Sequence, residues 1–449
     1  MNARADERLG PLSRLHVVAH ELGASSPAQP RLASLLRFLV QRGADVTLWI
    51  ERDPGPWAAQ IVGAGRLTVR VVADPVHRGY RWLGSLSGGK GAPPAAAPTS
   101  APTAAKPPSL LHRLWRLGSR VQSALLFPDP QRFWAARVQR RLLATMRPGD
   151  VVLTCSRPES ALLVGAAAQR RGARWWADFA DGWCFQGLRP NAMTDGPRRD
   201  RELALERSLV GSADLVSTVN DELGDYFASL RNGRHIAVYP NIVPDELAAL
   251  PATARARGDA LPTIGYFGRL SLSDGERSLL PLLALLRADA VAADRRRARF
   301  EFLGEFAPRD RAEIDEVQRL GHEVVVAPPL SRERLAARRA DFDGALVLGS
   351  PHQRGTSSKL LDTLGLGLPV VAFVPVPSAA HALITATGCG EVMDLTEIPD
   401  CTRWRRFLST VRGTAYRVDP RVRERYTSAS VLPGFLATIG PWLETATPR

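Results

Sequence analysis

Apolar residues recur along the chain in short runs that alternate with longer stretches of helical spacing. The run at 15–19 predicts a strand, residues 32–40 place leucines and a valine on one helical face, and the run at 46–50 predicts a second strand. Gly43 ends the helix between them. This order predicts a βαβ unit, whose parallel sheet must be covered on both faces.

The same alternation resumes at Asp150 and continues almost to the end of the chain. It predicts strands at 151–154, 174–178, 215–218 and 236–239, separated by helices near 160–170, 200–210 and 221–229. After a linker at 250–261, rich in Ala, Arg, Gly and Pro, it predicts strands at 263–267, 300–303, 323–326, 345–348, 370–374 and 391–393. The expected fold is therefore α/β, with two doubly wound, Rossmann-like domains facing a central cleft.

Composition adds limits on the class of protein. A length of 449 residues suits two domains, and 45% hydrophobic and 7% aromatic residues are typical of a globular protein. No apolar run approaches the roughly 20 residues of a membrane span, and the charged segment 1–13 lacks the pattern of a signal peptide. The four cysteines are scattered without a CxxC pair, which argues against a zinc site or a disulfide framework and favours a cytoplasmic protein.

The formal net charge of +14 predicts an anionic partner: a phosphorylated substrate, a membrane surface or a nucleic acid. Nucleic acid is the least favoured, because the sequence has no zinc finger and no strand motif that combines aromatic and basic residues. A compositional preference for arginine explains part of the charge equally well.

Residues 84–109 consist mostly of Gly, Ser, Ala, Pro and Thr and predict a disordered linker or insertion. The next segment, 110–127, has the spacing of an amphipathic helix, with Leu111, Leu114 and Trp115 on one face. Such a helix either packs its apolar stripe on the protein core, which is the favoured interpretation, or lies on an anionic membrane surface.

The chain has only three lysines, so 59 − 3 = 56 of its basic residues are arginines. Two of the lysines lie in the 84–109 segment, and the third, Lys359, follows Ser357 and Ser358 at the start of an expected short helix. Helix N-termini bind anions through free N–H groups and the helix dipole. Lys359 is therefore a candidate phosphate-binding residue, although a helix can also begin with this sequence by chance.

Four segments, 20–26, 177–183, 264–269 and 355–371, carry a family resemblance through their order and spacing. Asp178-Phe-Ala-Asp-Gly-Trp183 is similar to an Asp-Phe-Arg-Asp-Pro-Trp motif, Pro240-Asn-Ile242 to Pro-Asn-Gly, and Phe267-Gly-Arg269 to a Phe-x-Gly-Arg turn. With these motifs the chain resembles the GT-B glycosyltransferases, in particular the retaining, nucleotide-sugar-dependent group (glycosyltransferase group 1, family 4-like). Members of this group build bacterial surface polysaccharides and lipid-linked glycans.

The resemblance implies a domain division and a donor site. It divides the chain into an acceptor domain at 1–249, a donor domain at 262–410 and C-terminal helices at 411–449 that cross back to the first domain. The implied donor-binding residues, which hold the diphosphate and the ribose of a nucleotide sugar, are Gly268, Arg269, Ser357, Ser358, Lys359 and Asp362. The alternatives are a surface role for Arg269 and a simple helix pair between Lys359 and Asp362.

The implied acceptor site lies in the first domain, with Gly23, Ser25 and Trp183 as acceptor-binding residues and Asp181, Asp178 and His20 as catalytic candidates. An inverting enzyme needs one of the three catalytic candidates as a general base, whereas a retaining enzyme of this type needs none. Trp183 in the core and Asp181 as a loop cap are the structural alternatives.

Two positions depart from the family pattern: Arg354 stands where retaining members carry Glu, and Asp274 where a lysine is common. The expected activity is hexosyl transfer from a nucleotide-diphosphate sugar to a hydroxyl acceptor, without a metal or other cofactor, in the synthesis of a polysaccharide, glycolipid or other glycan. The departures leave two alternatives open: a nucleotide-sugar 2-epimerase and an inactive GT-B binding protein. Peripheral attachment to the inner face of the membrane through 110–127 also stays open.

Overall fold

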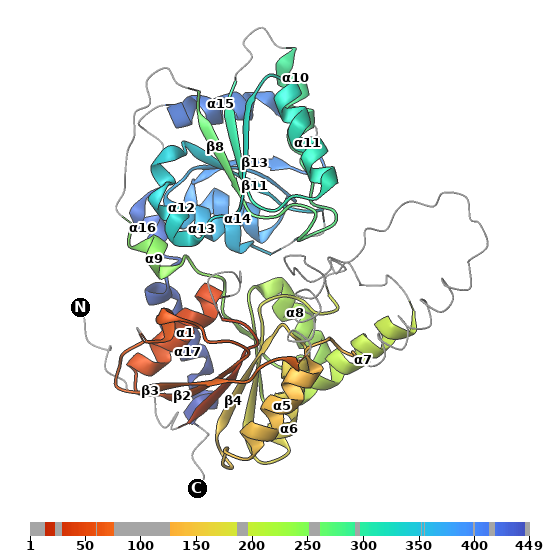
Figure 1. The fold of residues 1–449 in the computed structure, drawn as a ribbon, viewed down its shortest axis with the longest axis vertical. Helices are drawn as coiled ribbons and strands as arrows, with labels where there is room; N and C mark the ends of the chain where they lie inside the picture. Colours follow the sequence, from red (N-terminus) through yellow and green to blue (C-terminus); the bar gives the residue numbers. More distant parts are fainter. Residues whose placement is uncertain are drawn as a thin grey trace, which may run out of the picture.

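The computed structural model describes residues 14–22, 29–59, 61–75, 126–185, 196–250, 261–291, 297–351, 353, 355–397, 400–412 and 418–444. Two parallel sheets, each with helices on both faces, form two domains that lie one above the other in Figure 1. This arrangement confirms the predicted fold class. No helix of the described residues is long and apolar enough to cross a membrane.

The first sheet has seven strands in the order β3-β2-β1-β4-β5-β6-β7. Their bounds are β1 Leu15–Val18, β2 Asp45–Ile50, β3 Arg66–Val71, β4 Val151–Ser156, β5 Arg174–Phe179, β6 Leu215–Thr218 and β7 Ala237–Val238. The chain winds outward in both directions from β1 and β4, which are paired in parallel. Loops at the carboxyl ends of two such strands form the crevice where open α/β sheets bind ligands.

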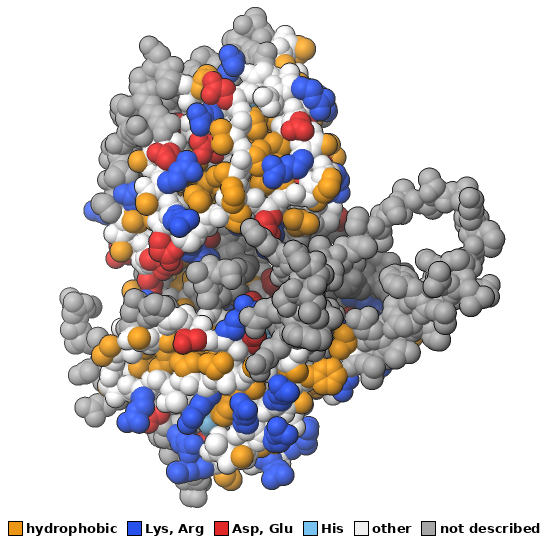
Figure 2. Space-filling view, viewed as in Figure 1, with side chains coloured by type: hydrophobic (Ala, Val, Ile, Leu, Met, Phe, Trp, Pro, Cys, Tyr) orange, Lys and Arg blue, Asp and Glu red, His pale blue; other side chains and the backbone are white. Residues whose placement is uncertain are grey.

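The helices of the first domain are α1 Gln29–Gln41, α2 Pro56–Ala59, α5 Arg132–Leu143, α6 Ser160–Gln169, α7 Pro197–Ser212 and α8 Asp221–Leu230. α9 Asp245–Ala248 follows β7 and packs against helices of the second domain. α6 lies very close to the sheet because it carries Gly165: a Cβ at this position would come within 2.0 Å of Nε1 of Trp175. Lys and Arg side chains gather on the end of this domain that lies away from the second domain (Figure 2). Arg137, Arg140 and Arg141 of α5 are exposed.

The second sheet has six strands in the order β10-β9-β8-β11-β12-β13. Their bounds are β8 Thr263–Phe267, β9 Arg299–Leu303, β10 Glu323–Ala327, β11 Gly344–Leu348, β12 Val370–Val374 and β13 Gly390–Asp394. The helices are α10 Leu280–Ala290, α11 Pro308–Arg319, α12 Arg332–Ala337, η1 Arg339–Asp341, α13 Ser358–Leu366, α14 Ala379–Thr387, α15 Cys401–Arg412 and α16 Pro420–Glu424. Its switch point lies between β8 and β11, so both sheets direct a crevice toward the same space.

The last helix, α17 Ser428–Glu444, lies on the first sheet although the chain has by then passed through the second domain. Its Leu432, Phe435, Leu436 and Ile439 are buried in the same core as β1 and β2. Phe435 stacks on Tyr239 with ring centroids 4.9 Å apart. The core of the first domain is therefore built from both ends of the chain.

The sequence pattern missed several elements of the first domain, including β3 and α5. β3 is an edge strand with only partly buried side chains, and α5 has more arginines than a typical amphipathic pattern. The expected linker at 84–109 and residues 110–125 of the expected amphipathic helix lie outside the described residues.

Candidate functional site

A cleft of about 870 Å³ lies between the two domains. One wall is formed by residues at and after the carboxyl ends of β1, β4, β5 and β6, and the other by the segments that follow β8 and β11. The cleft therefore lies at the carboxyl ends of the strands of both sheets, where both domains present loops and helix N-termini.

Lys359 lies on the second-domain wall in the first turn of α13. Ser357 caps this helix by accepting a hydrogen bond from the Leu360 N–H. The Lys359 ammonium donates to the carbonyl of Arg269 at 2.8 Å and lies 5.3 Å from the centre of the Tyr266 ring. It is therefore fixed against the loop that follows β8.

Gly268 makes this position of Lys359 sterically feasible. The residue has a φ of +126°, and a Cβ here would lie 2.6 Å from Cε and 2.8 Å from Nζ of Lys359. Only glycine satisfies both the backbone conformation and the close approach of the lysine. The predicted donor-binding residues Gly268, Arg269 and Lys359 are thus brought together by the structure.

The pKa of Lys359 is lowered to about 7, first because burial removes the ammonium from water and then because of the charges of Arg277 and Arg269. Asp362 and Asp274 oppose this shift only in part. An anion bound beside Lys359 would oppose this shift and favour the protonated lysine.

Arg269 and Asp362 differ in their relation to the cleft. Arg269 lines the cleft, is more than half exposed and forms a 2.7 Å ion pair with Glu305. Asp362 is held by Arg332 of α12, with Nε and Oδ1 3.0 Å apart, and is not among the described residues that line the cleft. Burial raises the pKa of Asp362, and Arg332 opposes that effect.

His20 lies on the first-domain wall, directly after β1. Its Nε2 is 3.2 Å from Oδ2 of the fully buried Asp74, and its ring meets the edge of Trp134 at a centroid distance of 4.9 Å. The imidazole is therefore oriented by a carboxylate and an aromatic ring. Asp74 could not be predicted from the sequence, because the pairing joins loops 54 residues apart.

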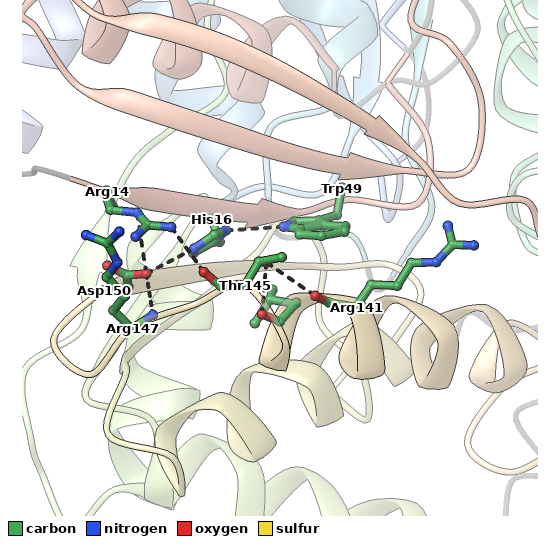
Figure 3. A network of polar contacts seen from close by, with 8 residues as sticks. Arg14, His16, Trp49, Arg141, Thr145, Arg147 and Asp150 are labelled. Atoms are coloured by element: carbon green, nitrogen blue, oxygen red, sulfur yellow. Dashed lines mark hydrogen bonds and ion pairs between the residues drawn. The ribbon is translucent and has the colours of Figure 1, made fainter.

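A second histidine–aspartate pair lies near the opposite end of β1 (Figure 3). Nε2 of His16 is 3.2 Å from Oδ2 of Asp150, while its Nδ1 faces the indole N–H of Trp49 at 3.3 Å. Both ring nitrogens are thus engaged, and burial lowers the pKa of the imidazole. This pair ties β1 to the loop before β4 and does not line the cleft.

Asp178 at the end of β5 is committed to an internal ion pair. Its carboxylate accepts hydrogen bonds at 2.6 and 2.7 Å from the guanidinium of Arg31, and a third bond from Ser217. Arg31 also donates to the carbonyl of Tyr239 at 2.6 Å. A carboxylate whose oxygens accept from three donors suits the joining of α1 to the sheet better than proton transfer.

Asp181 and Trp183, three and five residues after Asp178, lie in different surroundings. The Asp181 side chain is 55% exposed, faces the cleft and lies 3.7 Å from Arg157. The carboxylate has solvent-accessible surface, but the surrounding walls of the cleft reduce the water near it and raise its pKa, and Arg157 opposes the rise. Trp183 is 2% exposed and packs in the core beside β5 and α7, as the structural alternative predicted. Gly23 and Ser25 lie outside the described residues.

Among the described residues, no group of three or more His, Cys, Asp or Glu side chains could hold a metal ion. Arg354, the first departure from the family pattern, lies outside the described part of the chain, as does His352.

The structure is similar to several solved structures over nearly its whole length. Sucrose-phosphate synthase from Thermosynechococcus elongatus matches 97% of this chain and 100% of its own, with 12% identity and a TM-score of 0.61. A UDP-forming α,α-trehalose-phosphate synthase from Burkholderia xenovorans, in complex with glucose-6-phosphate, matches 96% and 100%, with 15% identity and a TM-score of 0.59. Anabaena HepE, in complex with UDP and glucose, matches 95% and 98%, with 13% identity and a TM-score of 0.55.

No protein-family model matches the sequence, and no curated protein matches it. The similarity to the solved structures, at identities of 12 to 15%, shows that the chain has the GT-B fold. The activity has to be argued from the cleft, because one fold hosts many functions.

Proposed function

We propose that this GT-B protein is a glycosyltransferase that moves a hexosyl group from a nucleotide-diphosphate sugar to a hydroxyl group of an acceptor. The observation that carries the proposal is the placement of Lys359. Its ammonium lies on the second-domain wall at the N-terminus of α13, and no described carboxylate forms an ion pair with it. Anabaena HepE was solved in complex with UDP and glucose, and the trehalose-phosphate synthase in complex with glucose-6-phosphate, which agrees with this class of substrate.

The leaving group of such a reaction is a nucleoside diphosphate, which gains negative charge as the bond to the sugar breaks. Lys359, Arg269 and the N-terminus of α13 are fixed positive groups in a partly enclosed site. Preorganised charges of this kind stabilise a developing anion without reorganising during the reaction. The donor would therefore lie on the second-domain wall and the acceptor on the first-domain wall.

On the acceptor wall, His20 is better arranged than Asp181 or Asp178 to act as a general base. Asp74 orients the imidazole as the third group of a catalytic triad does, and His20 lines the cleft. A base at this wall removes the proton of the acceptor hydroxyl during direct, inverting transfer. A retaining reaction would leave His20 without that role.

The donor site is tested by thermal shift with UDP, GDP, dTDP and ADP on wild type and Lys359→Ala. A ligand at 100 times its Kd stabilises a protein by about 2.7 kcal/mol, which is readily measured. One nucleotide should stabilise wild type and have a smaller effect on the variant. If none of the four stabilises wild type, the proposal fails.

The base is tested by His20→Ala and Asp74→Asn in a transfer or donor-hydrolysis assay. We expect kcat to fall about 10²- to 10⁴-fold for His20→Ala, the range typical of a general base. The released sugar should have the inverted anomeric configuration by NMR. A retained configuration, or an unchanged kcat, would show that His20 is not a base; Asp181→Asn provides the comparison on the same wall.

The alternative of a non-catalytic binding protein is favoured by one observation, the carboxylate of Asp274 where a lysine is common in the resembling family. An epimerase is the other alternative on this fold. Donor incubated without an acceptor separates the three: an epimerase converts the sugar, a glycosyltransferase at most hydrolyses it slowly, and a binding protein leaves it intact. Since the proposal needs no metal, transfer should persist in EDTA.

A further inference from the structure

Arg277, in the segment after β8, is a buried cation without a matching anion. The residue is 7% exposed and lines the cleft. Its Nη1 donates to Oγ of Ser273 at 2.8 Å and its Nη2 to Oε1 of Gln353 at 3.0 Å. Both partners are neutral. Nε has no hydrogen-bond partner, and no described carboxylate forms an ion pair with the guanidinium.

A buried guanidinium without an ion pair lowers the stability of the folded protein. A purely structural role for Arg277 does not explain why this cost is present. Burying a charge is unfavourable unless an opposite charge and hydrogen bonds compensate for the lost water. The buried Arg31 meets this requirement through its bidentate pair with Asp178. Arg277 has the hydrogen bonds to orient its planar group but lacks the anion.

Burial without a partner does not by itself identify a binding site, and the chain contains a useful contrast. Arg231 is 5% exposed and has two guanidinium nitrogens without partners, but it is not among the residues that line the cleft. What distinguishes Arg277 is its position beside two other cations that do line the cleft, Lys359 and Arg269.

The positive charges on the second-domain wall repel one another, and a bound anion would reduce this repulsion. Arg277 is the largest charge effect on Lys359, after burial, in lowering the pKa of the lysine. The one carboxylate nearby among the described lining residues of this wall is Asp274; its Oδ1 accepts from the Glu276 N–H, and its Oδ2 has no hydrogen-bond partner. Asp274 therefore does not neutralise the guanidinium by contact.

We propose that Arg277 is a principal phosphate-binding residue of the cleft, and that its guanidinium binds the diphosphate of the donor beside Lys359. The inference rests on the proposed function and deepens it, because it names the group that supplies the positive charge absent at position 274. The free Nε–H, together with an Nη–H, presents the two-pronged edge with which arginine binds two oxygens of a phosphate.

This assignment has an unusual consequence for stability. If Arg277 serves to bind the diphosphate and not to stabilise the fold, replacing it with a neutral side chain of similar length removes an uncompensated charge from the protein without ligand. Arg277→Met should therefore have a Tm equal to or above that of wild type without ligand. A structural arginine would show the opposite, a clear fall in Tm.

The experiment is calorimetric titration of wild type, Arg277→Met, Arg277→Lys and the control Arg231→Met with inorganic pyrophosphate, UMP, UDP and GDP, together with Tm values without ligand. We expect Arg277→Met to weaken binding of pyrophosphate and the preferred nucleoside diphosphate by about tenfold or more, as for a lost charge-assisted hydrogen bond. Binding of the monophosphate should change less, Arg277→Lys should be intermediate, and Arg231→Met should bind like wild type.

Wild-type affinity in Arg277→Met, or a loss of affinity that accompanies a Tm several degrees lower, would overturn the role of Arg277. The outcomes also separate this inference from the proposed function. Pyrophosphate binding that depends on Arg277, with no nucleotide binding or sugar transfer, would keep the anion site and overturn the glycosyltransferase. Transfer that is unaffected in Arg277→Met would do the reverse.

Discussion

Lys359 shows how a single side chain can link substrate binding to pH. Its pKa is lowered to about 7, because the ammonium is largely removed from water and lies near Arg277 and Arg269. A bound diphosphate favours the protonated form and raises this pKa. Above pH 7, binding must therefore take up a proton that the free lysine has largely lost.

From the direction of this shift we predict that the contribution of Lys359 to diphosphate affinity is constant below about pH 6 and falls as pH rises above 7, by up to about tenfold per pH unit until the pKa of the complex is reached. Calorimetry at pH 8 in two buffers of different ionisation enthalpy should detect the proton uptake. Lys359→Arg, which stays charged throughout, should abolish the uptake. A proton uptake that persists in Lys359→Arg would assign it to another group.

Gly268 and Gly367 allow backbone strain to be separated from the shape of the site. Both have positive φ, +126° and +73°, but a Cβ at Gly268 meets Lys359 whereas one at Gly367 meets nothing within 4 Å. We predict that Gly268→Ala and Gly367→Ala both lose about 1 kcal/mol of stability or somewhat more in urea unfolding, because alanine is strained at positive φ. Only Gly268→Ala should also weaken nucleotide binding, and equal binding losses would contradict the steric argument.

At the scale of elements, the sequence pattern predicted every strand of the two sheets except the edge strand β3. Strands such as β4 and β12 are buried on both faces, so they read as continuous apolar runs bounded by polar residues. The edge strand β3 alternates only weakly because its side chains are partly exposed, and it was missed. The burial that produces a pattern is strongest at the centre of a sheet.

The candidate site was predictable only where its residues carry a local signal. Lys359 could be found because Ser357 and the helical pattern after it predict a helix N-terminus at this position. Gly268 and Arg269 could be found because they belong to a recognisable turn motif. Asp74 and Arg277 could not, because their importance comes from burial and from contacts with residues 54 and 76 positions away. Asp178 and Trp183 were found as conspicuous residues, but tertiary contacts decide that they are structural.

The expected amphipathic segment at 110–127 leads to a prediction about an element outside the described residues. If it binds anionic lipid, deletion of 110–126 should abolish co-flotation with vesicles that contain phosphatidylglycerol, while the Tm stays unchanged. Vesicles of phosphatidylcholine alone are the control. Binding that survives the deletion would assign membrane contact to another surface, and a large fall in Tm would indicate that the segment packs on the core.

At the scale of the whole molecule, α17 joins the end of the chain to the first domain. Leu432, Phe435 and Ile439 fill the core that β1 and β2 begin. We predict that a protein truncated after Thr427 binds the dye ANS and aggregates, because it exposes this apolar face. A synthetic peptide of residues 428–444 added during refolding should restore solubility. A truncated protein that is monomeric and keeps the wild-type Tm would contradict the role of α17.

The position of α17 also sets an order of events during synthesis. Ribosomes release a chain from its N-terminus, and domains usually fold as they emerge. Here the first domain waits for residues that are translated after the whole of the second. The nascent chain must therefore carry an open hydrophobic face while nearly two hundred further residues, from roughly 250 to 431, are made. A chaperone that binds apolar surface on the ribosome should matter more to the yield of this protein than to one whose first domain is closed by its own sequence.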